Sequence, residues 1–307
     1  MAPRICMVGS SNMDLIARVP RVPAPGETLI GSRFQTSFGG KGANQAVMAA
    51  RLGAQVAVVT KLGRDVFGEN TLANYHAQGI DTSAVFFDEQ SSSGVALITV
   101  DENTGQNSIV IVPGANYTLT TADIQAASGV IQSADVIMAQ IEIPIAITLE
   151  AFRVAKAGGK ATTILNPAPA APLPDELLRL TDIIVPNEIE AAMLTALPTG
   201  TLDEATAAAR ALQGWGIQMV VLTLGSRGAL LVNGDEAPQY VRAQAVQAVD
   251  TTGAGDAFVG SFAYLLGSGF SPLAAVERAA AIATRSVLKP GAQPSFPTRD
   301  EVAEFLH

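Results

Sequence analysis

Short apolar runs rich in β-branched residues alternate with Ala- and Leu-rich stretches along most of the chain. This alternation is typical of an α/β protein with a mostly parallel central sheet and helices on both faces. The predicted strands are residues 5–8, 56–60, 136–140, 161–165, 183–185 and 220–223. The predicted helices are residues 43–52, 68–78, 147–157, 202–215 and 272–287.

Three stretches interrupt the alternation, because they carry strand-like residues without an intervening helix. They are residues 14–19, 27–38 and 94–112. Residues 99–111 predict a hairpin that turns at residues 101–105 (DENTG). The pattern leaves open whether these stretches are separate surface hairpins or one small sheet, which would need cover for an apolar face.

A Gly-rich segment, residues 250–256 (DTTGAGD), runs directly into the apolar residues 257–263 (AFVGSFA). The apolar run predicts a buried helix that ends near residues 267–269. Free N–H groups at a helix N-terminus favour an anion, and glycines let the backbone approach it. Asp256 would lie at this anion site. It would either cap the helix or take a proton from a hydroxyl that attacks a phosphoryl group.

A second Gly-rich segment, residues 38–46 (FGGKGANQA), also runs into a predicted helix. Its Asn44 either faces solvent or forms hydrogen bonds to the hydroxyls of a ligand. The sequence has no Gly-x-x-x-x-Gly-Lys-Ser/Thr motif, so phosphate binding cannot depend on a P-loop.

Composition narrows the function classes. The net charge is −9 without a basic run, which disfavours a nucleic-acid partner, and no apolar run reaches membrane-spanning length. A single cysteine, Cys6, excludes an internal disulfide, and the N-terminus lacks a signal-peptide pattern. We therefore expect a cytoplasmic enzyme. With only His76 and His307, neither a Ser-His-Asp site nor a His-rich zinc site is expected.

Residues 39–46 and 250–256 resemble the two signature segments of the ribokinase family of sugar kinases. Six further segments, spread over nearly the full length, fit the same family. They are residues 9–14 (GSSNMD), 25–28 (PGET), 166–169 (NPAP), 186–190 (PNEIE), 223–228 (TLGSRG) and 291–295 (GAQPS). The resemblance implies a single ribokinase-like α/β domain over residues 1–307. It also implies a β-lid formed by segments of about 14–38 and 94–112, through which two chains would pair as a homodimer.

The activity implied by the resemblance is ATP-dependent phosphorylation of ribose to ribose 5-phosphate. Alternatives are a family member that acts on deoxyribose, another sugar or a nucleoside, and a catalytically inactive sugar-binding protein. The intact residues 253–256 argue against an inactive protein, because a mere binder has no use for a base at an anion site. A Rossmann-type oxidoreductase is disfavoured because the strand-Gly-x-Gly-x-x-Gly-helix unit is missing near the N-terminus.

Site residues can be carried over from the family position by position. Asp256 would be the catalytic base. The remaining sugar-binding residues would be Asn12, Asp14, Gly40, Lys41, Asn44 and Glu142. Alternatives from the local sequence remain open: Asn12 and Asp14 are also typical turn residues, and Glu142 could cap the next helix.

The nucleotide and metal sites are implied in the same way. ATP would contact Asn187, Thr223, Gly225, Gly228, Gly253, Ala254 and Gly255. Glu190 would act on Mg²⁺ through water, although Asn187 and Glu190 could also form an ordinary first helical turn. A K⁺ ion would be held by Asp250, Thr252, Ser286, Lys289, Gly291 and Ser295, with a hydrogen-bonded loop as the alternative.

Overall fold

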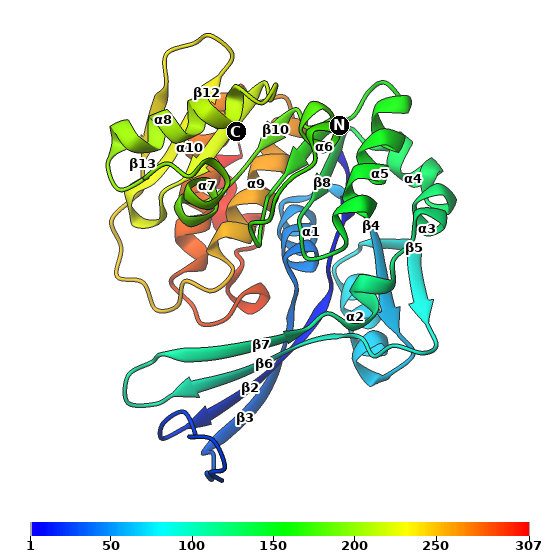
Figure 1. Ribbon diagram of the computed structural model, residues 1–307, viewed down its shortest axis with the longest axis vertical. Coiled ribbons are helices and arrows are strands. Elements are labelled where there is room, and N and C mark those ends of the chain that lie inside the picture. Colours follow the sequence, from blue (N-terminus) through cyan, green and yellow to red (C-terminus); the bar gives the residue numbers. More distant parts are fainter. Residues whose placement is uncertain (1, 307) are drawn as a thin grey trace.

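The computed structural model describes residues 2–306, so His307 lies outside the described residues. The central sheet has nine strands in the order β13-β12-β11-β10-β9-β8-β1-β4-β5 (Figure 1). Its strands are β1 (Arg4–Val8), β4 (Gln55–Gly63), β5 (Asp81–Asp88), β8 (Val136–Ala139), β9 (Thr162–Leu165), β10 (Ile183–Ile184), β11 (Met219–Thr223), β12 (Gly228–Asn233) and β13 (Gln239–Arg242). All pairs are parallel except β11 with β12 and β12 with β13.

Helices cover both faces of this sheet. One face carries α1 (Lys41–Leu52), α2 (Val66–Ala77), α9 (Ala254–Gly267) and α10 (Pro272–Ser286). The other carries α3 (Thr121–Ala126), α4 (Ser128–Ser133), α5 (Ile145–Ala157), α6 (Asp175–Arg179), α7 (Glu188–Thr195) and α8 (Leu202–Gln213). Short 3₁₀ helices are η1 (Gly114–Thr118), η2 (Gly225–Arg227), η3 (Gln293–Ser295) and η4 (Asp300–Phe305).

Strand β1 shows why the sheet strands are continuous apolar runs. Ile5 and Met7 enter the core under one helical layer, whereas Cys6 and Val8 enter the core under the other. Successive side chains of a strand point to opposite faces, so a strand covered on both sides needs apolar residues throughout.

In the part of the chain that the structure describes, no helix is long and apolar enough to cross a membrane.

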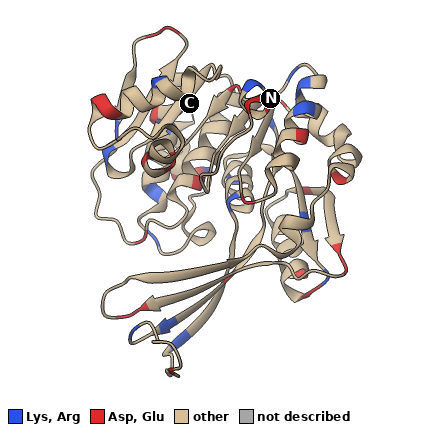
Figure 2. Ribbon diagram, in the orientation of Figure 1, with Lys and Arg blue, Asp and Glu red and all other residues tan. Residues whose placement is uncertain are grey.

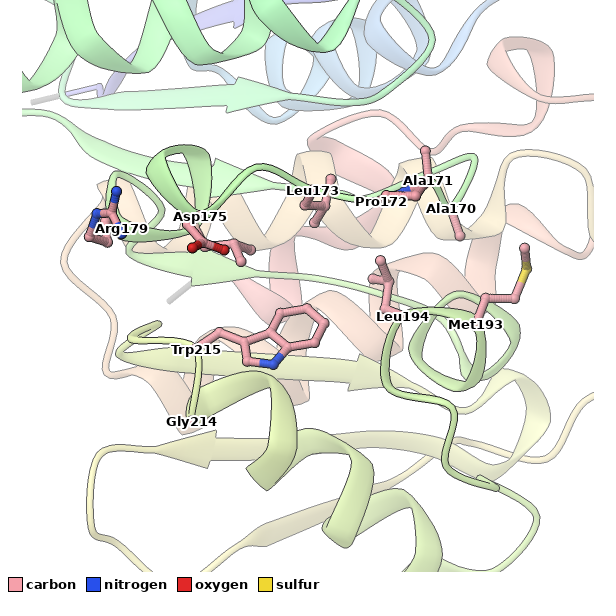
Figure 3. Close-up of a pocket in the computed structure, with 11 residues that line it drawn as sticks. Ala170, Ala171, Pro172, Leu173, Asp175, Arg179, Met193, Leu194, Gly214 and Trp215 are labelled. Carbon is pink, nitrogen blue, oxygen red and sulfur yellow. The ribbon is translucent and has the colours of Figure 1, made fainter.

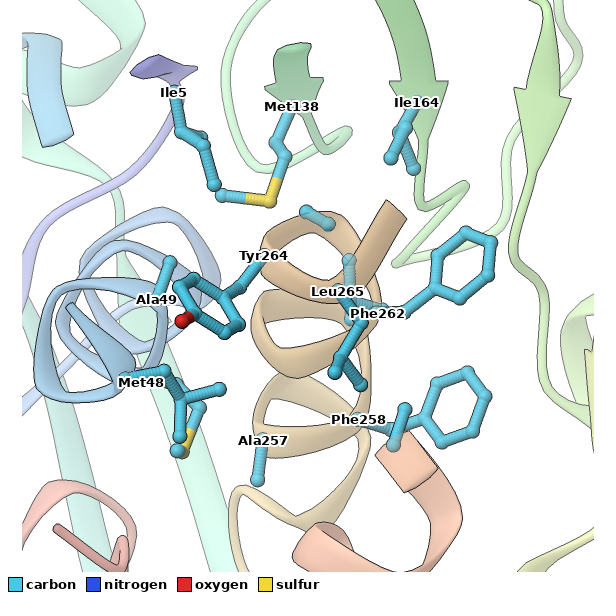
Figure 4. Close-up of a cluster of buried hydrophobic side chains, with 14 of the residues drawn as sticks. Ile5, Met48, Ala49, Met138, Ile164, Ala257, Phe258, Phe262, Tyr264 and Leu265 are labelled. Carbon is cyan, nitrogen blue, oxygen red and sulfur yellow. The ribbon is translucent and has the colours of Figure 1, made fainter. Parts of the chain in front are cut away.

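Helix α9 is buried over ten consecutive residues, from Asp256 to Leu265. Its Phe258 and Phe262 rings stack with centroids 6.2 Å apart, and Figure 4 shows α9 between strand side chains such as Met138 and the Met48 region of α1. A Cβ atom on Gly260 would lie 2.5 Å from the Gln45 carbonyl oxygen. Glycine at this position therefore lets α9 and α1 approach closely, and this brings their N-terminal turns together.

A separate four-stranded sheet extends from the body (Figure 1). Its order is β3-β2-β6-β7, from β2 (Asn12–Val19), β3 (Arg33–Gly39), β6 (Gly94–Asp101) and β7 (Asn107–Val112). Strands β6 and β7 form the predicted hairpin, and the three predicted stretches join as one sheet, which we call the lid. Every residue of β7 is exposed.

The predicted fold class is confirmed, with the predicted strands and helices shifted by a few residues. The prediction missed β5 and the antiparallel pair β12 and β13. In β5, buried Ala84 stands among exposed and half-buried positions, because the strand lies at the sheet edge. Its sequence therefore lacks the continuous apolar run of the inner strands.

Candidate active site

Asp256 lies in the first turn of α9, and its side chain turns toward α1. The helix begins after Gly253, whose φ of 78° is left-handed, and no side chain caps it. The Asp256 carboxylate is buried; Oδ2 accepts from Asn44 Nδ2 at 2.9 Å and Oδ1 from Gln45 Nε2 at 3.0 Å. The helix-capping interpretation of Asp256 is therefore wrong, and the alternative that Asn44 faces solvent is wrong as well.

The charge on Asp256 is balanced chiefly by Lys41. Burial raises the pKa of Asp256, whereas Lys41 and the hydrogen bonds from Asn44 and Gln45 oppose that rise. Burial lowers the pKa of Lys41, but the carboxylates of Asp256, Glu142 and Glu190 raise it above its ordinary value overall. Lys41 is therefore a stable cation beside a carboxylate that has a raised affinity for protons.

Two further predicted sugar residues lie near the start of β2. Asp14 and Asn12 lie in β2, so the turn interpretation is wrong. The Asp14 carboxylate packs against Gly39, where a Cβ atom would lie 2.3 Å from Oδ1. Burial, with Glu142 and Asp256, raises the pKa of Asp14 to about 7. Its carboxyl group therefore gains or loses a proton near neutral pH.

Glu142 and Asn12 are held by hydrogen bonds from their neighbours. Glu142 Oε2 accepts from Ser10 Oγ at 2.5 Å and from the Lys41 N–H at 3.1 Å, so it joins the β1–β2 connection to α1. Glu142 does not cap α5, whose N-terminal flanking residue is Pro144 without a side-chain bond. Asn12 Oδ1 accepts from Asn116 Nδ2 at 2.8 Å. Gly40, with φ 86°, supplies the left-handed residue that leads from β3 into α1.

A cavity of about 190 Å³ opens beside Asp256. Its lining brings together residues of the predicted sugar, nucleotide and magnesium sites, namely Lys41, Asp256, Asn187, Thr223, Gly253, Gly255 and Glu190. Asn166, Ala168, Val185 and Val259, which were not predicted as site residues, complete it. A Cβ atom on Gly255 would have no neighbour within 4 Å, whereas one on Gly253 would lie 2.7 Å from the Ala292 Cβ. Gly225, Gly228 and Ala254 are not among the residues that line it.

Asn187 and Glu190 form a capping box at the start of α7. Glu190 N–H donates to Asn187 Oδ1 at 2.8 Å, and Glu190 Oε2 and Oε1 accept from Asn187 N and Nδ2 at 2.9 and 2.8 Å. The first-turn interpretation is confirmed. Among the described residues, no three His, Cys, Asp or Glu side chains gather as metal ligands. The donors therefore fit only a magnesium ion that keeps most of its waters, and that role of Glu190 stays a prediction.

The predicted K⁺ residues lie on two segments, residues 250–252 and 286–295, which Asp250 joins. Its Oδ1 accepts from Thr252 N and Oγ1 at 2.9 and 2.7 Å, and its Oδ2 accepts from Gly291 N at 2.8 Å. Lys289 instead pairs with Glu301 at the surface, at 2.9 Å. Ser286 and Ser295 donate to the carbonyls of Ala283 and Ala292, both at 2.8 Å. The hydrogen-bonded loop is thus present, its carboxylate and carbonyl oxygens suit a hard cation, and the ion stays a prediction.

A larger hollow, of about 600 Å³, lies apart from these residues. Figure 3 shows Trp215, Leu173, Leu194 and Met193 around it, with Asp175 and Arg179 toward one end. None of the predicted site residues lines it. Lys and Arg are scattered over the ribbon among Asp and Glu (Figure 2).

Sequence reasoning missed several polar residues that shape the site. Gln45 and Asn166 bond to each other at 3.0 Å beside Asp256, and Asn116 holds Asn12. Gln45 directly follows Asn44 in the second Gly-rich segment, and Asn166 begins a segment that was assigned to the family without a role. Only these motif positions marked Gln45 and Asn166, and Asn116 lies outside every motif of the sequence analysis.

Comparison with known proteins identifies the family. Residues 2–299 match the profile of the pfkB family of carbohydrate kinases. The chain belongs to this family. It is therefore a carbohydrate kinase, a phosphotransferase, as the two Gly-rich segments predicted.

Full-length relatives of this pfkB carbohydrate kinase include both a ribokinase and a deoxyribokinase. It is 40% identical over 306 residues to a ribokinase of Haemophilus influenzae, covering 100% of this chain and 99% of the relative. It is 40% identical over 303 residues to a deoxyribokinase of Salmonella typhimurium, with 98% of each chain covered. The chain spans 56% of the length of a bifunctional ribokinase/ribose-5-phosphate isomerase A of Fructilactobacillus sanfranciscensis, at 41% identity.

A solved structure agrees with the fold. The structure of an Arabidopsis thaliana ribokinase complexed with ribose and ATP superposes with a TM-score of 0.91 at 35% identity, covering 100% of this chain and 99% of that one.

Proposed function

We propose that this carbohydrate kinase transfers the γ-phosphoryl group of ATP to the 5-hydroxyl of D-ribose. Asp256 takes the proton of that hydroxyl as its oxygen attacks the γ-phosphorus. The bond between this phosphorus and the oxygen of ADP breaks, and ADP leaves. The observation that carries the proposal is the buried Asp256 carboxylate, held by Asn44 and Gln45 at the N-terminus of α9.

In this proposal Asp14, Asn12, Asn44 and Glu142 bind the sugar hydroxyls, with Gly40 and Lys41 completing that side. A carboxylate accepts hydrogen bonds from hydroxyls, and an amide both accepts and donates, so the set suits a polyol. Lys41 also lies where negative charge develops during transfer, and its raised pKa keeps it cationic. The Arabidopsis ribokinase complexed with ribose and ATP supports the choice of both substrates.

The nucleotide would lie over the N-terminus of α9. The N–H groups of Gly253, Ala254 and Gly255 would receive its phosphates, because φ of 78° at Gly253 turns the backbone into the helix. In this structure the Ala254 N–H donates to the Thr251 carbonyl oxygen at 3.2 Å. Asn187, Thr223, Gly225 and Gly228 would contact the nucleotide nearby. Glu190 would hold magnesium through water, and the ion would supply positive charge to the phosphates.

A potassium ion would stabilise the same loop. Asp250, Thr252, Ser286, Lys289, Gly291 and Ser295 would supply oxygens, mostly backbone carbonyls, and Asp250 would add its carboxylate. Asp250 already joins residues 250–252 to Gly291, so an ion there would order the loop that carries Gly253.

The sugar is the least constrained part of the proposal, because relatives at 40% identity include a ribokinase and a deoxyribokinase. The test is an ADP-release assay with ATP and magnesium over a panel of ribose, 2-deoxyribose, fructose and a nucleoside. We expect the highest kcat/KM with ribose. A higher value with another member of the panel would replace ribose by that substrate.

We also propose that the chain works as a single domain and pairs through its lid. Ile109 and Ile111 of β7 lie on one face of the lid and are 52% and 51% exposed, whereas Leu97 of β6 and Val110 of β7 lie on the other face and are 46% and 59% exposed. A small exposed apolar sheet favours burial against another surface, and a second lid would provide one. Sedimentation of Ile109→Asp should show monomers, with the exposed polar change Ser108→Asp as the control. A dimer that persists in Ile109→Asp would reject pairing through this sheet.

A further inference from the structure

Gln45 lies at the centre of a chain of side-chain amides beneath the proposed base. It is fully buried in α1. Its Nε2 donates to Asp256 Oδ1 and to Asn166 Oδ1, both at 3.0 Å, so both amide hydrogens are used. Its Oε1 accepts from Gln140 Nε2 at 2.5 Å. All hydrogen-bonding groups of this amide except one lone pair are therefore committed.

A backbone carbonyl fixes the orientation of the amides in this chain of side chains. Asn166 Nδ2 donates to the Val185 carbonyl oxygen at 2.8 Å. A carbonyl only accepts, so Asn166 must turn its NH₂ toward Val185 and its Oδ1 toward Gln45. Gln45 must then present its NH₂ to Asn166, and the same NH₂ faces Asp256. The Val185 carbonyl group, directly after β10, thus dictates which end of Gln45 meets the carboxylate.

Gln140, at the far end of this chain of side-chain amides, is confined by packing. Gln140 is fully buried, and a Cβ atom on Gly9 would lie 2.1 Å from its Oε1. Within residues 2–306, this Oε1 has no hydrogen-bond partner. The lack of a side chain at Gly9 therefore makes room for the Gln140 amide that holds Gln45 Oε1.

We infer that Gln45 is a positioning residue for Asp256: through the amide chain it sets the plane of the carboxylate and favours its charged form. The inference rests on the proposed role of Asp256 as the base. A donor that faces a carboxylate favours its charged form, so loss of Gln45 Nε2 must favour the protonated acid. Protonated Asp256 cannot take the proton of a hydroxyl.

The charged and titratable groups around Asp256 stay the same when Gln45 is changed. Lys41 faces it from α1 and Glu142 from the segment after β8. Asp14 faces it from β2 and Glu190 from α7. A change in the pH profile of a Gln45 variant therefore reports on the lost hydrogen bond.

The test is Gln45→Met, which keeps the length of the side chain and removes both donors. We expect kcat at pH 7 to fall by about 10- to 100-fold, since small misplacement of a reacting group costs up to about a hundredfold. The KM values for sugar and ATP should hold. Two or three hydrogen bonds lower the pKa of a carboxylate by about two pH units, so the loss of one should raise it by about one. The acidic limb of the kcat–pH profile should therefore move to a pH about one unit higher.

Ser261→Ala is the matched control. It removes a buried hydroxyl of α9 that has no hydrogen-bond partner among the described residues, so it perturbs the same helix without the amide chain. Its acidic limb should stay at the wild-type pH. If Gln45→Met does not fold, Gly9→Ala tests the same chain, because its methyl group displaces Gln140 and removes no polar atom. In that variant too the acidic limb should move up.

A wild-type kcat and acidic limb in Gln45→Met, or in Gly9→Ala if it replaces that variant, would overturn the inference. So would a fall in kcat without movement of the acidic limb, because that is loss of packing alone. Asp256→Asn separates this failure from failure of the proposed function. An inactive Asp256→Asn beside a normal Gln45→Met rejects only the positioning role, whereas an active Asp256→Asn rejects the base itself.

Discussion

Replacing Asp256 by Asn tests the proposed base with the smallest change of shape. Both carboxylate oxygens accept hydrogen bonds, from Asn44 Nδ2 and Gln45 Nε2. Gln293 donates to Asn44 Oδ1 at 3.1 Å, so Asn44 must keep its NH₂ toward residue 256. Gln45 is fixed by Asn166. Either orientation of the new carboxamide therefore places its NH₂ against a donor.

Two effects of different size follow. One buried hydrogen bond becomes a donor–donor contact, which costs about 1–3 kcal/mol of stability, partly offset because the neutral amide no longer suffers the desolvation of a buried charge. Loss of a general base costs about 10²- to 10⁴-fold in rate, or about 3–5 kcal/mol of transition-state stabilisation. The catalytic effect is larger, so the protein should fold, bind sugar and fail to turn over.

The assay is ADP release with saturating ribose and ATP, beside calorimetric titration of ribose and thermal unfolding. Asp235→Asn, which neutralises an exposed carboxylate, controls for the change in net charge. We expect kcat to fall by at least about a hundredfold, with ribose binding still measurable. An Asn variant that keeps more than about a tenth of wild-type kcat would refute Asp256 as the base.

Three further predictions concern neighbouring groups. Asp14→Ala should raise the KM for ribose by about 10- to 100-fold, since a hydrogen bond to a charged group contributes about 1.5–3 kcal/mol, while the KM for ATP changes little; equal rises in steady-state assays would argue against a sugar role. Burial, with Glu142 and Asp256, raises the pKa of Asp14 from 3.8 to about 7, so the folded state holds a proton that the unfolded chain has released. The unfolding free energy should therefore fall as pH rises across that interval, and urea titrations of Asp14→Asn should show a shallower fall; an equal fall would contradict the raised pKa. Initial rates should rise with KCl at constant ionic strength, and Asp250→Ala should flatten the response; a flat wild-type curve would exclude activation by K⁺.

Local patterns were sufficient for the fold class, whereas for Asp256 they left a cap or a base open and the family resemblance implied the base. The apolar runs of the inner strands and the Gly-rich turns before α1 and α9 act over a few residues, so the sequence displays them directly. Strand β5 escaped because edge position, a property of the assembled sheet, decides which of its residues are buried.

The partners of the site residues could not be predicted in the same way. Gln45 and Asp256 are 211 positions apart in the sequence and meet only because Gly260 lets two helices pack closely. Asn187 and Glu190 illustrate the converse. The spacing alone allowed a cap or a metal role, and the structure shows the cap while leaving the metal role as a prediction.

The residues of the proposed site lie on two parts of the molecule, the lid and the body, which short connections join. Strand β2 begins four residues after β1 ends, and β3 ends at Gly39, two residues before α1 begins. Two further crossings, from β5 to β6 and from β7 to η1, also join the lid to the body, so a lid that swings must bend at all four. Asp14 would travel with the lid, whereas Asp256 and its amide partners would remain on the body. Hinge motion would then govern how long a sugar stays bound, while the base keeps its alignment throughout the cycle.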